Sequence, residues 1–287
     1  MIHLETRGSV PDEEAARVRN LLEECYDRLQ PDGPDFVEVI IFENDRMWRS
    51  HFATERRKAG VTSSEVDEAF MAAHDAWTGI PRISISIERK QQLPDLVWEG
   101  ALRHEAGHSI LHGGLEYYIF PMPRDLSKAA TSFPGLRDHL TDILYLLTLA
   151  VKDVEVTNLL VSNGYVEDQA AYARFLLKPT EQDLDSWTIS ALASEARVLC
   201  LVGRLKDMAA AMVLASRPDE FRVSLEEIDQ SMNYLPRDLR ETLLDTMLRI
   251  LKGLGRDTFA NIQTAGELLV AGIVEPVMKG SSSTQES

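Results

Sequence analysis

Three residues with the side chains and spacing needed for metal chemistry lie together at His104, Glu105 and His108. On a helix, residues four apart lie one above the other on the same face, so His104 and His108 can direct their imidazoles at one metal ion. Glu105 then lies beside the metal, where a carboxylate can accept a proton from a metal-activated water. The combination predicts metal-assisted hydrolysis, the chemistry that cleaves peptide bonds.

The residues around this triplet predict the helix that must hold it. Apolar residues recur at helical spacing between Leu93 and Leu111, after Pro94 and before the helix stop signal Gly113-Gly114. The stretch 97–111 is therefore read as one helix. The alternative interpretation is two surface histidines and a glutamate on a solvated helix face, which would have no metal function.

The stretch His104-Glu105-Ala106-Gly107-His108 matches the pattern H-E-x-x-H, and here the chain resembles the zincin superfamily of metallopeptidases, in its gluzincin and aspzincin branches. The resemblance implies Zn2+ as the cofactor, a peptide or protein as the substrate, and Glu105 as the catalytic base. The longer pattern H-E-x-x-H-x-x-G-x-x-H is absent, which disfavours the metzincins.

A catalytic zinc ion usually takes three protein ligands, so two histidines are not enough. His112 follows His104 by eight residues, about 12 Å along a straight helix, which is too far for both to bind one ion. We expect His112 to pack near the end of the helix, or to contact a metal-binding residue without itself binding the metal.

The remaining zincins take an acidic third ligand from a later helix, and two carboxylates in the stretch 151–160 compete for this role. Asp153 is preferred, because its helical neighbours are apolar and a carboxylate on such a face needs a cation. Glu155 has more polar neighbours but a longer side chain, and it is the alternative. Weaker candidates are Glu116, Asp138, His139 and Asp142.

Hydrolysis also needs a donor that stabilises the developing negative charge. Tyr117, Tyr118 and His139 are candidates, and no spacing rule selects among them. The aromatic, proline-containing connection 115–123 that carries the two tyrosines can wall one side of a cleft.

The elements expected before the motif helix alternate between strand and helix. They are a strand at 2–7, a helix from Pro11 to about Pro31, a strand at Phe36–Phe42, helices at 45–59 and 63–77, and a strand at Pro81–Glu88. The last strand alternates Ile with Ser, which predicts one buried and one polar face. In the family that the chain resembles, the strand before the motif helix is a sheet edge to which the substrate adds, which makes Ile83–Ile87 the expected substrate-binding edge.

The second half reads as helical throughout, with a long helix at about Leu136–Asn163 and further helices to about residue 278. The predicted fold class is α+β, mostly helical, with a small mixed N-terminal sheet followed by an all-helical half. We expect a zincin-like subdomain at 1–114, a helical subdomain at 115–279 that supplies the third ligand, and a disordered tail at 280–287.

The amino-acid composition limits the kinds of partner that the protein is expected to bind. Lys and Arg number 30 against 46 Asp and Glu, a net charge of -16, which argues against nucleic acid or an anionic membrane as a partner. The N-terminus has no signal-peptide pattern, and the longest apolar runs are too short to cross a bilayer. Cys25 and Cys200 read as free thiols, which predicts a cytoplasmic protein, and the sequence does not determine the oligomeric state.

The sequence therefore predicts a zinc-dependent metallopeptidase. The alternative is a zincin-like metal-binding regulatory or protein-interaction module without peptidase activity, and a third interpretation is a helical structural protein that binds no metal. Two histidines and one carboxylate also suit non-haem iron, but the H-E-x-x-H helix favours zinc.

Overall fold

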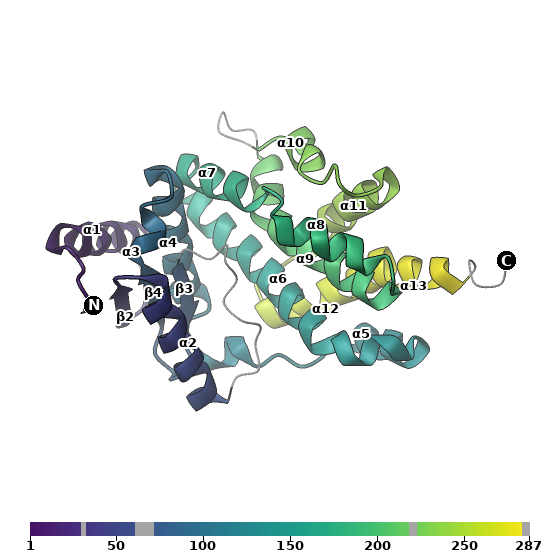
Figure 1. The fold of residues 1–287 in the computed structure, drawn as a ribbon, viewed down its shortest axis with the longest axis horizontal. Helices are drawn as coiled ribbons and strands as arrows, with labels where there is room; N and C mark the ends of the chain where they lie inside the picture. The colour runs from purple at the N-terminus through teal and green to yellow at the C-terminus, as the bar shows by residue number, and fades with distance from the viewer. Residues whose placement is uncertain (30–32, 61–71, 218–222, 283–287) are drawn as a thin grey trace. The chain divides into compact units, whose positions relative to one another are not determined.

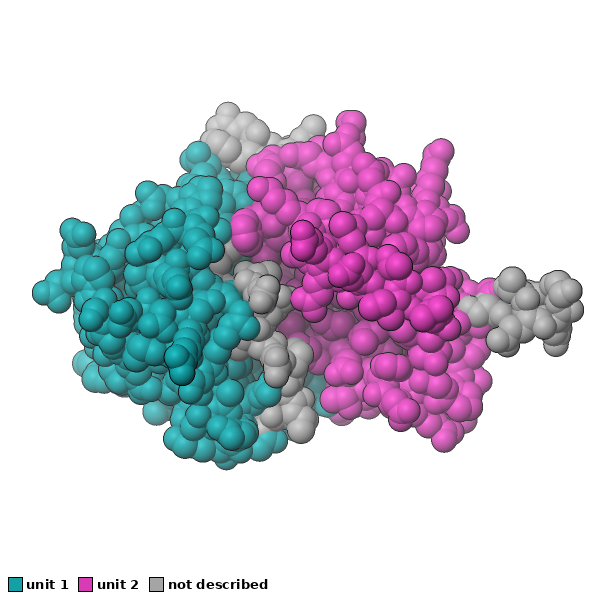
Figure 2. Space-filling model, in the orientation of Figure 1, with its two compact units in different colours: residues 1–120, 155–172 teal, residues 121–154, 173–287 magenta. Residues whose placement is uncertain are grey.

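The structure is a computed structural model, which describes residues 1–29, 33–60, 72–217 and 223–282. It divides into two compact units, one of residues 1–120 and 155–172 and one of residues 121–154 and 173–287 (Figure 2). The division falls inside the helices α6 (Leu140–Ser162) and α7 (Glu167–Leu176), so each of these helices contributes to both units. The fold is α+β and mostly helical, which confirms the predicted class.

The first unit contains a four-stranded mixed sheet (Figure 1). Its strands lie in the order β1-β2-β4-β3, and β3 is antiparallel to β4 whereas β1, β2 and β4 run parallel. The strand β4 therefore lies inside the sheet, and the prediction that Ile83–Ile87 forms a substrate-binding edge is wrong. The bounds are Ile2–Arg7 for β1, Val37–Phe42 for β2, Ala72–Asp75 for β3 and Arg82–Ser86 for β4.

Helices cover both faces of this sheet. The helix α2 (Asp45–Ala59) contacts β2 and β4 on one face, and α1 (Asp12–Arg28) and α4 (Asp95–Leu111) contact the strands on the other. All five residues of β4 are consequently buried, including Ser84 and Ser86. The alternation of Ile and Ser does give β4 two faces of different polarity. The polar face is buried as well, because α2 covers it.

The predicted helix 63–77 falls largely outside the described residues, which resume at Ala72. Residues Ala72–Asp75 form β3, so the prediction is wrong for this part. The residues of this segment, Ala-Ala-His-Asp, do not alternate between apolar and polar, so they carry no strand pattern. It is a strand because its backbone pairs with β4, from Ala72 opposite Ile85 to Asp75 opposite Arg82.

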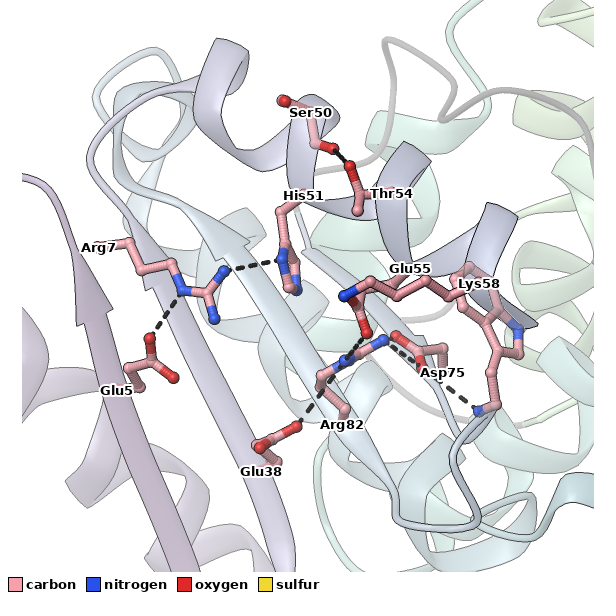
Figure 3. Close-up of polar contacts among 11 residues, drawn as sticks. Glu5, Arg7, Glu38, Ser50, His51, Thr54, Glu55, Lys58, Asp75 and Arg82 are labelled. Carbon is pink, nitrogen blue, oxygen red and sulfur yellow. Dashed lines mark hydrogen bonds and ion pairs between the residues drawn. The ribbon is translucent and has the colours of Figure 1, made fainter. Parts of the chain in front are cut away.

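Ionic side chains lie between α2 and the sheet (Figure 3), where Ile40, Phe42 and Trp48 also form an apolar cluster. Arg82 donates two hydrogen bonds to the fully buried carboxylate of Asp75, both at 3.0 Å, and a third to Glu55 at 3.3 Å. Burial raises the pKa of Asp75 and the neighbouring Arg82 opposes this shift.

Nearby, Arg7 donates to Nδ1 of His51 at 2.8 Å. A guanidinium can only donate, so neutral His51 carries its proton on Nε2.

The second unit is helical. Its long helix α9 (Ser194–Ala215) contacts the α-helices α8, α10, α11 and α13 and the helical segments η2 and η3. Arg204 of α9 is buried and donates to the carbonyl of Leu177 at 2.7 Å, which ties α9 to the end of α7.

In the described part of the chain, no helix has the length and apolar character needed to span a membrane.

The remaining elements complete the chain as follows. They are α3 (Ile87–Lys90), η1 (Leu115–Tyr118), α5 (Arg124–Ser132), η2 (Pro134–His139), α8 (Glu181–Ser190), α10 (Leu225–Gln230), α11 (Arg237–Gly253), α12 (Thr258–Leu269), the π-helical η3 (Val270–Val274) and α13 (Glu275–Ser282). The predicted long helix thus begins at Leu140, after the 3-10 turn η2. Residues 283–287 of the predicted tail lie outside the described residues.

The environment of His51 makes stability depend on pH. Burial, and then the charges of Arg7 and Arg82, lower the pKa of His51 to about 4, whereas the unfolded chain takes up this proton below about pH 6.5. The unfolded state therefore binds more protons in this window, and we expect the free energy of unfolding to fall as the pH drops from about 6.5 to about 4.

The measurement is urea unfolding at about pH 7 and about pH 5. The variant His51→Gln should lose less stability than the wild type between these pH values, because it removes the titrating group. The control is His3→Gln, at an exposed histidine. An equal pH dependence in all three proteins would contradict the assignment.

Candidate metal centre

The H-E-x-x-H residues lie on α4, which begins at Asp95 directly after Pro94 and ends at Leu111 with His112 as its C-cap. Proline before the first turn is favoured because its fixed φ suits the helix entry and the first amides lack helical partners. His104, Glu105 and His108 are buried, with exposed fractions of 3%, 6% and 7%. The alternative of surface histidines on a solvated helix face is therefore wrong.

Two glycines let α4 approach its neighbours closely. A Cβ atom on Gly107 would lie 2.7 Å from Cγ1 of Val156 on α6, and one on Gly100 would lie 2.4 Å from the carbonyl oxygen of Asp168 on α7. Both distances are shorter than a van der Waals contact, so glycine is required at both positions for this packing. The second glycine of the motif helix thus sets the spacing between the histidines and α6.

Asp153 comes from α6 and lies with the two motif histidines. It shares one face of α6 with Val156 and Leu160, three and seven residues on, and these two side chains face Gly107. One ligand atom each of His104, His108 and Asp153 can be chosen so that all three lie within 4.8 Å of one another. The prediction of Asp153 as the third ligand stays a prediction, and the position of its side chain is compatible with it.

The donor atoms suit zinc. Zinc binds imidazole nitrogen and carboxylate oxygen at about 2.0–2.2 Å, and a tetrahedral arrangement then places the donors about 3.4 Å apart. The three donor atoms lie within 4.8 Å of one another, so bound zinc would draw them closer together by side-chain rotation. Two imidazoles and one carboxylate leave a fourth position for water, as in catalytic rather than structural zinc sites.

Glu155, the alternative third ligand, has a different partner. Its Oε2 lies 2.9 Å from Nε2 of His112, and Nδ1 of His112 lies 3.1 Å from Nδ1 of His108. His112 thus contacts His108, one of the two candidate metal-binding histidines. Of the weaker candidates, Glu116, Asp138 and Asp142 have exposed side chains, and His139 lies in η2.

Three aromatic residues complete the surroundings of the histidines, and two of them were not predicted. The ring of His74 on β3 stacks on His108 at 6.1 Å, and the ring of Tyr172 on α7 lies 5.3 Å from that of His104. Tyr118 donates to or accepts from Nδ1 of His74 at 2.9 Å. His74 and Tyr172 are far from the motif in sequence, and no spacing rule could have indicated them.

Further contacts fix α4 in the unit. The hydroxyl groups of Tyr26 on α1 and Ser109 on α4 lie 2.6 Å apart, and burial raises the pKa of Tyr26. On the opposite side, Arg103 donates to the carboxylate of Asp168 at 2.7 Å. These contacts hold the motif helix between α1 and α7, so the histidines are presented by a rigid element.

No protein-family model matches this chain, and neither a curated protein nor a solved structure is significantly similar to it. The resemblance to zincins therefore rests on the H-E-x-x-H helix alone. What the structure adds is the grouping of donors that the pattern leaves open: two imidazoles from α4 and a carboxylate from α6.

The close packing of α4 on α7 can be tested at Gly100. Alanine in a helix is normally more favourable than glycine by up to about 1 kcal/mol. At Gly100, however, the added methyl group would meet a backbone carbonyl that cannot rotate away. We expect Gly100→Ala to destabilise the protein by about 1–3 kcal/mol.

The matched control is Gly203→Ala in α9, where a Cβ atom would have no neighbour within 4 Å. This variant should be neutral or slightly stabilising. Urea unfolding of both variants measures the difference, and a Gly100→Ala protein as stable as Gly203→Ala would refute the close approach of α4 to α7.

Proposed function

We propose that this protein is a zinc-dependent metallopeptidase. The observation that carries the proposal is the grouping of His104, His108 and Asp153 within 4.8 Å, with Glu105 next to His104 on the same buried helix. A structural zinc site is normally closed by four protein ligands, whereas this donor set has three among the residues that the structure describes. The set therefore supports a site in which water or a substrate takes the remaining position.

The bound metal would supply a more acidic water and would polarise the carbonyl of the scissile bond. The other steps fall to residues of this chain. Glu105 accepts the proton of the attacking water and then donates it to the leaving amine. Burial of Glu105, at 6% exposure, keeps bulk water from competing for that proton.

Tyr118 is better placed than Tyr117 to stabilise the developing negative charge. Its hydroxyl lies 2.9 Å from His74, whose ring stacks on the metal-binding His108. Tyr117 instead packs its ring against His112, at 5.2 Å. We therefore propose that Tyr118, oriented by His74, donates the hydrogen bond to the substrate oxygen.

The strand β3 is the proposed substrate-binding edge in place of β4. It is the last strand of the sheet on its side in the described part of the chain, and it carries His74. An extended peptide can add to the edge strand of a sheet by main-chain hydrogen bonds, and main-chain pairing suits a substrate whose side chains vary. A peptide there would lie beside Tyr118.

We propose that the protein acts on a peptide or protein in the cytoplasm. Cys25 and Cys200 are free thiols in the structure, which supports a reducing compartment. Burial raises the pKa of Cys25 to about 12, so this thiol is unreactive at neutral pH. The net charge of -16 disfavours nucleic acid as the substrate.

The second candidate function is a metal-binding regulatory or protein-interaction module without peptidase activity. The same three donors favour it, since retention of a metal does not require catalysis. The two functions differ at Glu105, because a module that only binds metal has no use for a base beside it. Replacement of Glu105 therefore distinguishes them.

The test is metal content by elemental analysis together with hydrolysis of fluorescently labelled casein. We expect about one zinc per wild-type chain, as in mononuclear zinc peptidases, and loss of zinc in His108→Ala and Asp153→Ala. The variant Glu105→Gln should keep the zinc and lose activity by about 10²-fold or more, because it lacks a proton acceptor.

The control is Asp142→Ala, an exposed acid on the same helix as Asp153, which should keep both zinc and activity. A wild-type protein that holds no zinc after reconstitution would overturn the proposal. Zinc binding without activity in the wild type would favour the regulatory module. Full activity in Glu105→Gln would instead overturn the role of Glu105 as the base.

A further inference from the structure

We propose that Glu155 and His112 are positioning residues, which fix the protonation pattern of His108 so that its Nε2 is the nitrogen that binds the metal. This inference rests on the proposed metal site and names two residues that the H-E-x-x-H pattern does not contain. Neither residue would touch the metal or the substrate.

The three side chains form one line of short contacts. Oε2 of Glu155 lies 2.9 Å from Nε2 of His112, and Nδ1 of His112 lies 3.1 Å from Nδ1 of His108. His112 is fully buried at 0% exposure, and His108 is 7% exposed. All three residues belong to the first unit, with Glu155 on α6 and the histidines at the end of α4.

The chemistry of the groups allows one arrangement of protons along this line that leaves His108 able to bind a metal through Nε2. An ionised carboxylate only accepts hydrogen bonds, so Nε2 of His112 must donate to Glu155. A neutral imidazole carries one proton, so Nδ1 of His112 is then an acceptor. The proton between the two histidines must belong to Nδ1 of His108, and Nε2 of His108 is left with its lone pair.

The opposite arrangement would disable the ligand. If Nδ1 of His112 carried the proton, Nδ1 of His108 would have to accept it, and neutral His108 would carry its own proton on Nε2. That nitrogen could not bind a metal. With His112 neutral, Glu155 opposes this arrangement, because Nε2 of His112 would then be a buried acceptor facing a negative charge.

The position of His112 explains why two further residues are needed to orient the proton of His108. Metal-binding histidines usually give their second ring proton to a carboxylate, a backbone carbonyl or water. Here Nδ1 of His108 faces the side of α4 occupied by His112, which lies one turn further along the helix. The imidazole of His112 therefore links the carboxylate of Glu155 on α6 to the ring of His108.

The first experiment reads the protonation pattern in the metal-free protein by two-bond 1H-15N correlation spectra of the imidazoles at neutral pH. The chain has seven histidines, few enough for assignment by single substitutions. We expect His112 to carry its proton on Nε2 and His108 to carry its proton on Nδ1. In Glu155→Gln, whose amide can either donate or accept, both histidines should show a mixture of the two forms.

The second experiment measures zinc affinity by competition with a chromophoric chelator. Loss of a partner of this kind typically costs 10- to 100-fold in metal affinity, and we expect about this loss in Glu155→Gln and in His112→Phe. The controls are Asp142→Asn, an exposed acid on the same helix, and His139→Phe, a histidine of η2, which should bind zinc as the wild type does. Thermal unfolding of the metal-free proteins identifies any variant that fails to fold, and Glu155→Gln preserves the shape of the side chain.

The outcomes separate this inference from the proposed function. A wild-type His108 protonated on Nε2 in the metal-free protein, or unchanged zinc affinity in a folded Glu155→Gln protein, overturns the positioning role while the peptidase proposal stands. If the wild type binds no zinc, the proposed function falls, and the spectra still show whether Glu155 sets the protonation of His112 and His108.

Discussion

The close approach of α4 to α6 is the constraint on which the site depends. A Cβ atom at Gly107 would lie 2.7 Å from Val156, so the helices can be this close only because the motif helix has glycine there. Side chains on the facing surface of α6 then reach the histidines of α4, as the grouping with Asp153 shows. A wider spacing would leave the two imidazoles facing a carboxylate beyond bonding distance of a shared ion.

Two acids two residues apart on α6 have different partners as a consequence of helix geometry. Successive residues on a helix are rotated by about 100°, so residues two apart point to different sides. Asp153 shares the face of Val156 and lies with His104 and His108, whereas Glu155 lies at the flank and bonds to His112. One helix therefore carries both Asp153, the candidate ligand, and Glu155, the partner of His112.

The sheet contributes one residue, His74 of β3, to the surroundings of the candidate metal site. His74 projects from β3 on the same face as its neighbour Ile83, toward α4, and its ring stacks on His108. The opposite face of the sheet carries the Arg82 and Asp75 ion pair under α2 (Figure 3). The alternation of a strand thus places an ionic layer on one face and a histidine of the site on the other.

The sequence by itself determined the strands β1, β2 and β4, the motif helix and its three polar residues, because their periodicity and end signals are local. It also ranked Asp153 above Glu155, from the apolar neighbours on its helix face. Only the tertiary structure decided that β3 is the edge strand, that residues 155–172 join the first unit, and that His74 and Tyr172 lie beside the histidines. These features depend on which segments pair and pack across long stretches of chain, and pairing of this kind leaves no fixed spacing in a single sequence.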